Sequence, residues 1–255
     1  NLKQEFPSKV EAEAKKIPLK ITQEEINRRV DLRYKTIITM DGADAKDLDD
    51  AVSVEMLENG NFLLGVHIAD VSHYVIEGSH IDKEALKRGN SVYLIDQVIP
   101  MLPKILSNGI CSLNPNADRL TLSISMEINK NGKVVNHEIY ESIIHSKARM
   151  IYSEVSDMLE NNDEELIEKY KEIYDSILLM NELAAILRKS RDERGSLDFD
   201  IDEAYITLNE QGIPINVETA ERRVANRIIE EFMLIANETI AEHFYWMGIP
   251  FVFRV

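Results

Sequence analysis

The sequence contains a single cysteine, Cys111, among its 255 residues. An internal disulfide is therefore excluded, and the Cys/His spacing of a structural zinc site is absent. Cys111 lies between the apolar residues Ile110 and Leu113, which predicts a small buried side chain rather than a reactive thiol. This cysteine usage fits a protein of the reducing cytoplasm.

Long apolar runs are also missing. No run approaches the roughly 18 residues that a membrane span needs, and the first residues lack the basic and apolar regions of a signal peptide. We therefore expect no membrane association. The chain begins without Met and ends in the strand-like pattern of residues 251–255, so we expect a piece of a longer protein.

Basic charge is scarce, because 29 Lys and Arg face 45 Asp and Glu and leave a formal net charge of −16. Proteins gain general affinity for nucleic acid from Lys and Arg that neutralise phosphates, so this balance argues against a general nucleic-acid binder. Divalent metals bound by carboxylates would remove the objection, as would basic domains outside this chain. The apolar content of 44% is ordinary for a globular protein.

Hydrophobic periodicity predicts hairpins interspersed with helices. The clearest strand covers residues 121–129, where Leu122, Ile124 and Met126 alternate with polar residues, so we expect one buried and one wet face. Strands are expected at residues 36–40, 51–54, 62–68, 121–129, 133–145, 199–208 and 213–217, with a strong turn signal at Asn59-Gly60. Helices are expected within residues 8–30, broken at Pro18 and capped at Thr22, and at residues 81–89, 163–190 and 222–246. The fold class is α+β, with a curved sheet or barrel wrapped by helices.

Four carboxylates lie within ten residues directly after the strand at 36–40: Asp41, Asp47, Asp49 and Asp50. Like charges this close repel and raise one another's pKa unless a cation lies among them. Ligation by oxygen alone selects Mg²⁺, Mn²⁺ or Ca²⁺. In a regular strand Asp50 would point away from Asp47 and Asp49, so convergence of the carboxylates requires a bulge or loop.

Two other readings compete for this acidic segment. On composition alone, a solvated acidic loop carries equal weight, although Leu48 inside the cluster favours a packed loop. A calcium-binding loop of the helix–loop–helix type is rejected, because Ala51 and Val52 stand where that loop needs a ligand and a glycine, and the context is a strand.

Other polar and aromatic residues have a structural and a functional reading. His67 and His73 could bind metal or transfer protons, but satisfied core histidines are the favoured interpretation. Tyr93 and Phe199 could be core aromatics or platforms on which unpaired bases stack, and the residues alone favour the core. Glu230 and Glu231, on the predicted last helix, are interpreted as surface carboxylates.

The run Asp41-Gly42-Ala43-Asp44-Ala45-Lys46-Asp47-Leu48-Asp49-Asp50 resembles the active-site motif of the ribonuclease II/ribonuclease R family. Further blocks resemble that family in the same order: residues 65–74, 99–103, 106–107, 111–113, 194–199 and 229–237. Several independent blocks in order make chance agreement improbable. The lead-in before residue 30 most resembles the bacterial ribonuclease R members.

The resemblance implies a fold and an activity. The fold would be the RNB catalytic domain, a helix-wrapped, antiparallel, barrel-like structure. It would cover residues 31–255 and remain incomplete at its C-terminal end, while residues 1–30 would be a helical lead-in from an N-terminal RNA-binding domain. The activity would be processive hydrolysis of single-stranded RNA from its 3′ end to nucleoside 5′-monophosphates, with Mg²⁺ as cofactor and Mn²⁺ as the alternative. The full-length enzyme would be a monomer.

The resemblance also assigns roles to residues. Asp41, Asp47, Asp49 and Asp50 would be the metal-binding and catalytic carboxylates, with Asp49 the most sensitive. Two metals about 4 Å apart would then drive an in-line displacement. Tyr93 would pack on the terminal base, Phe199 would form the opposite jaw, and Glu231 would contact the terminal ribose.

The family's catalytic domain continues into a segment whose arginine assists the chemistry, and basic RNA-binding barrels flank the domain. Those parts would carry much of the positive charge that this chain lacks, so the chain alone is expected to be inactive. The competing function, from another class, is a catalytically inactive RNA-binding or scaffolding relative, which the four aspartates argue against. Calcium-dependent folding without RNA turnover would indicate a third, calcium-binding function.

Overall fold

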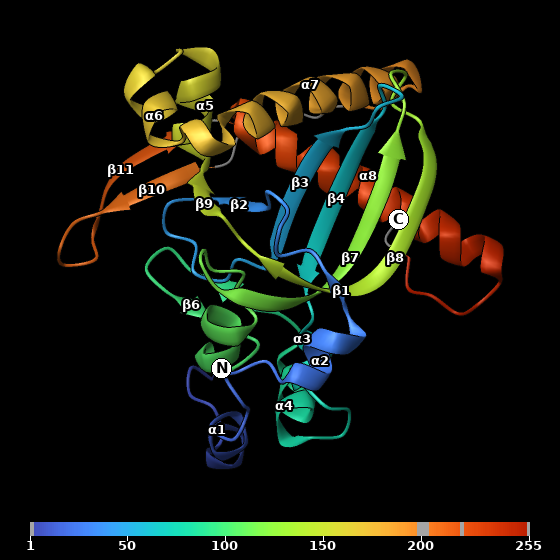
Figure 1. Ribbon diagram of the computed structural model, residues 1–255. Helices are drawn as coiled ribbons and strands as arrows, with labels where there is room; N and C mark the ends of the chain where they lie inside the picture. The colour runs from blue at the N-terminus through green and yellow to red at the C-terminus, as the bar shows by residue number, and fades with distance from the viewer. Residues whose placement is uncertain (1–2, 198–203, 220–221, 254–255) are drawn as a thin grey trace.

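The computed structural model describes residues 3–197, 204–219 and 222–253. Its centre is a seven-stranded sheet with the order β1-β8-β7-β4-β3-β2-β9 (Figure 1). The strands of this sheet are β1 (Val30–Asp31), β2 (Ile38–Asp41), β3 (Asp50–Met56), β4 (Phe62–Ala69), β7 (Asp118–Ile128), β8 (Val134–His145) and β9 (Ala148–Ile151). Two small sheets pair β5 (Val92–Tyr93) with β6 (Val98–Ile99), and β10 (Ala204–Leu208) with β11 (Pro214–Thr219).

Helices lie along one face of this sheet and beyond its lower end in Figure 1. They are α1 (Ser8–Ala14), α2 (Gln23–Arg28), α3 (Val71–Tyr74), α4 (His80–Arg88), the π-helix η1 (Ile105–Ile110), α5 (Tyr152–Glu160), α6 (Glu164–Lys169), α7 (Lys171–Glu193) and α8 (Val224–Met247). Within the described residues, no helix combines the length and apolarity that crossing a membrane requires.

The predicted hairpins form the middle of the sheet. β3 and β4 pair antiparallel from Asp50↔Ile68 to Met56↔Phe62, and the turn between them uses Gly60 at φ +79°, a backbone region that glycine enters without strain. β7 and β8 form the next hairpin. The predicted strands are confirmed here because period-two patterning and a strong turn signal agree locally.

The edges of the sheet differ from the expectation. β1 pairs parallel with β8, and β2 pairs parallel with β9, so the α+β class is confirmed but the sheet is mixed rather than antiparallel. A parallel neighbour comes from a distant part of the chain and leaves no local sequence signal. In the part of the chain that the structure describes, no pairing joins β1 to β9, so the barrel-like closure stays a prediction.

One face of the sheet packs against α5, α7 and α8, which lie behind and above it in Figure 1. The apolar stripe of α8 supplies Ile228, Phe232 and Ala236 to this core, and α7 supplies Ile177 and Leu183. The predicted last helix and its stripe are therefore confirmed. The predicted helix at 163–190 is two helices, α6 and α7, that meet at Tyr170.

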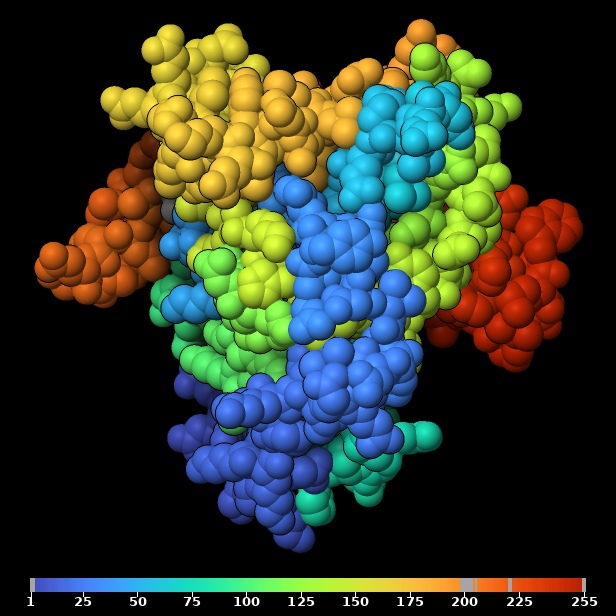
Figure 2. Space-filling view, viewed as in Figure 1, coloured from blue at the N-terminus to red at the C-terminus, as the bar shows by residue number. Residues whose placement is uncertain are grey.

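The other face of the sheet is also covered, by the N-terminal segment, α4 and η1 (Figure 2). Val10 and Ala14 of α1 are buried there, so α1 is a core element and not merely a lead-in. The same cover corrects the expectation for β7: Thr121 and Ser123, predicted on a wet face, are buried, while Leu122 is 45% exposed. Cys111 is buried among these residues, as predicted.

The C-terminal region agrees with the prediction in part. β10 and β11 confirm the hairpin around residue 212, but its first part, residues 199–203, lies outside the described residues. The strand-like pattern at residues 251–253 forms no strand. Phe251 instead stacks on Phe244 of α8, with ring centroids 4.5 Å apart.

Candidate active site

The acidic segment is the connection between β2 and β3. Asp41 is the last residue of β2, Asp50 is the first residue of β3, and Asp47 and Asp49 lie in the loop between them. The two strands share only the register pair Ile38↔Val52, so the chain is free to leave the sheet as a loop over residues 42–49. The prediction of a loop rather than a continuous strand is confirmed.

This loop is anchored to the core through Leu48, whose side chain is buried. The backbone N–H of Leu48 donates to Ser112 Oγ at 3.1 Å, and the Ser112 hydroxyl donates to the Lys46 carbonyl at 2.9 Å. The N–H of Leu113 donates to the Leu48 carbonyl at 2.7 Å. The acidic segment is therefore held to the core at Leu48, as predicted for a packed loop. Its other side faces solvent, since Gly42, Ala43, Asp44, Lys46 and Asp49 are exposed.

A second anchor comes from β9. Arg149 Nη2 donates to the carbonyls of Ala43 at 2.7 Å and Gly42 at 3.2 Å. At the far end of the loop, the carbonyl of Asp49 accepts from the N–H of Ala69, at the end of β4. The loop is thus fixed at its start, middle and end by three different parts of the chain.

The electrostatics of the loop reflect crowded carboxylates. Burial, with the charges of Asp50 and Asp49, raises the pKa of Asp41 to about 7, and the guanidinium of Arg149 opposes this rise. Burial and the charge of Asp49 raise the pKa of Asp50 to about 6. Burial also raises the pKa of Asp49. A cation among these groups would relieve their repulsion and restore their ionised forms.

The donors fit a hard divalent cation. Asp41 Oδ2 is buried and has no hydrogen-bond partner, so one carboxylate oxygen is free to ligate an ion. The four aspartates offer oxygen only, as Mg²⁺ and Mn²⁺ prefer. No three of the described His, Cys, Asp and Glu side chains are gathered tightly enough to hold an ion as they stand. The charges of Asp49 and Asp50 raise the pKa of Asp41, but the carboxylates are not gathered around one point.

Tyr93 of β5 lies at the loop. Its hydroxyl donates to Asp47 Oδ2 at 2.7 Å, and this bond, with burial, raises the pKa of Tyr93 to about 12. The residue is 65% exposed. The core interpretation of Tyr93 is therefore wrong, and the structure places the aromatic beside a predicted metal ligand.

Of the other two predicted RNA contacts, only Glu231 lies among the described residues. Phe199 lies outside the described residues. Glu231 is only 3% exposed, so its interpretation as a surface carboxylate is wrong. It accepts from Arg191 Nη2 at 2.7 Å and Nε at 3.2 Å, and Arg191 Nη1 also donates to Ser196 Oγ. Glu231 and Arg191 line a groove of about 1160 Å³ between the β7–β8 turn, α7 and α8.

The histidine blocks are structural. His67 is buried, and its ring nitrogens lie 2.7 Å from Ser123 Oγ and 3.3 Å from Ser53 Oγ. Burial lowers the pKa of His67 to about 3. Gly65 makes room for this network, because a Cβ there would lie 2.5 Å from Ser53 Oγ and 2.8 Å from His67 Nε2. The core interpretation of His67 is confirmed.

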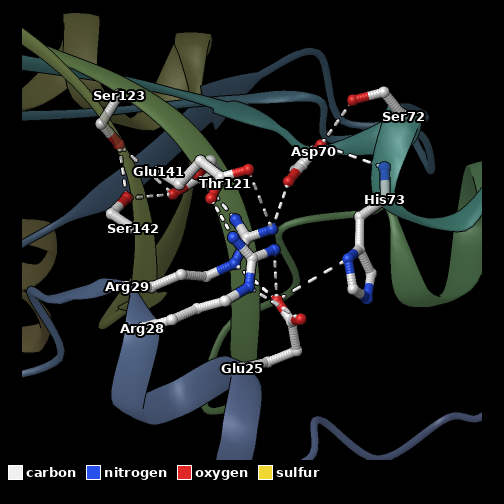
Figure 3. Close-up of polar contacts among 10 residues, drawn as sticks. All are labelled: Glu25, Arg28, Arg29, Asp70, Ser72, His73, Thr121, Ser123, Glu141 and Ser142. Carbon is white, nitrogen blue, oxygen red and sulfur yellow. Dashed lines mark hydrogen bonds and ion pairs between the residues drawn. The ribbon is translucent and has the colours of Figure 1, made fainter.

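The run at residues 70–73 takes part in an ion-pair network (Figure 3). Asp70 is buried, accepts from Ser72 Oγ and from the His73 N–H, and pairs with Arg29 Nη2 at 2.6 Å. Glu25 of α2 completes the network by accepting from Arg29 Nε at 3.0 Å. The ion pair between Asp70 and Arg29 thus holds the N-terminal segment against the sheet.

Sequence reasoning missed three residues of the site. Ser112 and Arg149 hold the loop, and Tyr152, the first residue of α5, is close enough to Asp41 and Asp50 for their charges, with burial, to raise its pKa. All three lie 60 or more residues from the loop along the chain. Ser112 lies in the block at 111–113 that resembles the family, but only the packing of Leu48 shows that it holds the loop. Only the β2–β9 pairing brings Arg149 to the loop.

Comparisons with known proteins agree with this geometry. The RNB domain matches residues 29–255. The chain is 53% identical to ribonuclease R 1 of Lactococcus lactis over 98% of its length and 31% of the relative's. It is 54% identical to ribonuclease R of Thermotoga maritima over 98% of its length and 35% of the relative's. The structure of Mycoplasma genitalium RNase R in complex with ribose-methylated single-stranded RNA superposes with a TM-score of 0.87 at 34% identity, covering 96% of this chain and 38% of that one. The chain spans about a third of the length of the curated relatives it matches.

Proposed function

The chain belongs to the RNB domain family, and we propose from this membership that it carries the catalytic core of a hydrolytic exoribonuclease. The substrate is single-stranded RNA, degraded processively from the 3′ end to nucleoside 5′-monophosphates. The named relatives are ribonucleases R, and the solved relative is in complex with single-stranded RNA. The full-length protein acts in the cytoplasm as a monomer.

The single observation that carries this proposal is the free oxygen of Asp41. A buried carboxylate oxygen without a partner costs free energy. Asp41 ends β2 directly before the loop, where the charges of Asp47, Asp49 and Asp50 act on it. Asp41, Asp47, Asp49 and Asp50 would hold Mg²⁺, with Mn²⁺ as the alternative. Two such ions, when bound, supply an activated water and stabilise charge on the attacking and leaving oxygens.

The protein's own groups bind and orient the RNA. The ring of Tyr93 is exposed and stacks on the terminal base, while its hydroxyl holds Asp47. Phe199 forms the second jaw. Glu231, fixed by Arg191, contacts the terminal ribose, because a carboxylate with a locked rotamer can accept from sugar hydroxyls. We also propose that the sheet of the RNB fold closes into a barrel-like structure wrapped by helices.

Asp49→Asn in the complete protein tests the function. We expect hydrolysis of single-stranded RNA with Mg²⁺ to fall by at least about 100-fold, because even partners of metal ligands are worth about 10–100-fold. Asp44→Asn is the matched control, since Asp44 is an exposed carboxylate of the same loop. The complete protein is used because the relatives are about three times as long as this chain.

The products discriminate between the enzyme and its alternative. Mononucleotides released at a constant rate by the wild-type protein support the exonuclease. RNA binding without release would indicate a catalytically inactive scaffold. Undiminished hydrolysis by Asp49→Asn would remove that aspartate from the site.

A further inference from the structure

Arg149 reaches the acidic loop from the neighbouring strand. β9 pairs parallel with β2 in the register Thr39↔Arg149 and Asp41↔Ile151. Residues paired in register leave the sheet on the same face, and so do residues two apart along a strand. Arg149, Thr39 and Asp41 therefore share one face at this edge, and the arginine side chain runs towards the loop that follows Asp41.

Among the described residues, the guanidinium of Arg149 donates hydrogen bonds to backbone carbonyls. Nη2 donates to the carbonyls of Gly42 and Ala43, the first two residues after Asp41. Both bonds come from one nitrogen, whose two N–H groups lie in the plane of the guanidinium. Arg149 thereby fixes the direction in which the chain leaves β2.

Three polar atoms of this face are buried and unpartnered: Thr39 Oγ1, Asp41 Oδ2 and Arg149 Nε. The charge of Arg149 acts to lower the pKa of Asp41, yet Arg149 Nε does not donate to Asp41 Oδ2. A direct guanidinium–carboxylate pair would be the ordinary way to satisfy both groups. The chain instead uses the arginine on backbone carbonyls and leaves the carboxylate oxygen open.

We infer that Arg149 is a positioning residue for the metal site: it holds the turn at Gly42 and Ala43 so that the free oxygen of Asp41 faces the other aspartates. It acts through the backbone and does not touch the reacting atoms. The inference rests on the proposed function, because it assigns a purpose to the same carboxylates. Arg149 also contributes a positive charge near Asp41, which opposes the repulsion from Asp49 and Asp50.

The test measures Mn²⁺ binding to the complete protein without RNA, by isothermal titration, for wild type, Arg149→Gln and Arg149→Lys. We expect Arg149→Gln to weaken Mn²⁺ binding roughly 10- to 100-fold, the effect usual for partners that orient a ligand. The Mn²⁺ affinity of Arg149→Lys should lie between those of wild type and Arg149→Gln, since lysine keeps the positive charge but not the planar guanidinium. The Mn²⁺ concentration for half-maximal RNA hydrolysis should rise by the same factor, with the KM for RNA unchanged.

Lys171→Gln is the control for loss of one positive charge, because Lys171 forms an exposed ion pair on α7. Far-UV circular dichroism checks that each variant is folded. If Arg149→Gln does not fold, the comparison of wild type with Arg149→Lys still tests the inference. Equal Mn²⁺ affinity in wild type and both variants overturns the inference while leaving the proposed function intact. A raised KM for RNA with unchanged Mn²⁺ affinity overturns it in favour of a phosphate contact. Absence of Mn²⁺ binding by the wild type overturns both proposals.

Discussion

The hydroxyl of Tyr93 donates a 2.7 Å hydrogen bond to Asp47 Oδ2. This bond joins the aromatic that we propose to stack on the RNA end to a carboxylate that we propose to bind metal. Base stacking and metal binding would therefore be coupled through one phenolic group. Because the ring is largely exposed, the hydroxyl can be removed without disturbing the packing of the core.

Tyr93→Phe tests this coupling, since it keeps the ring and removes only the hydroxyl. We expect the Mg²⁺ concentration for half-maximal hydrolysis to rise about threefold to tenfold, because a hydrogen bond to a charged group is worth about 1.5 kcal/mol or less at an exposed site. The KM for RNA should stay near the wild-type value. Tyr93→Ala should raise both quantities. A wild-type Mg²⁺ requirement in Tyr93→Phe would show that the hydroxyl has no part in metal binding.

Asp41→Asn should stabilise the protein when divalent metal is removed with a chelator at pH 8. The change deletes a buried charge that Asp49 and Asp50 repel, and we expect a rise in Tm of about 2–4 °C, or about 1 kcal/mol in a domain of this size. Added Mg²⁺ should stabilise the wild type more than the variant, because ligands stabilise the state that binds them. Thermal melts with and without Mg²⁺ measure both effects. A lower Tm of the variant in chelator would mean that Arg149 already compensates the charge.

Arg191→Gln should destabilise the protein strongly, because it leaves Glu231 buried without its ionic partner. We expect a loss of about 3 kcal/mol in the free energy of unfolding, measured by urea denaturation. Glu231→Gln should cost less, since Arg191 keeps its bond to Ser196 and is more exposed than Glu231. The double variant should recover part of the loss. Additive effects of the two changes would argue against a coupled pair.

Glu25→Gln should flatten the acid side of the stability profile. Hydrogen bonds from Arg28 and Arg29 outweigh burial and lower the pKa of Glu25 from 4.5 to about 2. A lowered carboxyl pKa gives stability that is complete above about pH 4.5 and is lost as pH falls towards 2. Urea denaturation at pH 6 and pH 3 should therefore show a smaller difference for the variant than for wild type. Glu168→Gln is the control, because Glu168 forms an exposed ion pair that contributes little.

Ser112→Ala should loosen the acidic loop from its middle. The change leaves the Leu48 N–H and the Lys46 carbonyl without the hydroxyl that satisfies them, and we expect a loss of about 1–3 kcal/mol in the free energy of unfolding. Amide hydrogen exchange should rise at residues 46–48 more than in β4. Unchanged exchange at these residues would show that Leu48 packing alone holds the loop.

Much of the fold was predictable from local patterns. The turn at Asn59-Gly60, the alternation along β7 and the stripe on α8 each contain enough information within about 20 residues to specify an element. The packed character of the acidic loop was predictable too, because Leu48 lies within the run of carboxylates and is buried.

The remaining features depend on contacts between distant residues. The β2–β9 pairing brings Arg149 to the loop, and the approach of α7 buries Glu231 against Arg191. Thr121 and Ser123 are polar yet buried, because a second layer formed by the N-terminal segment covers the face that alternation assigns to solvent. Periodicity shows that a strand has two different faces, but it does not show what covers each of them.

The distance along the chain between the acidic loop and Arg149 also has a consequence for synthesis. Ala43 and Arg149 are 106 residues apart, and ribosomes add about 5–20 residues per second. The loop therefore leaves the ribosome roughly 5–20 s before β9 can hold it. During that interval only the anchors at Ala69, Ser112 and Leu113 can form. The start of the loop at Gly42 and Ala43 therefore gains its partner last, after β9 has left the ribosome.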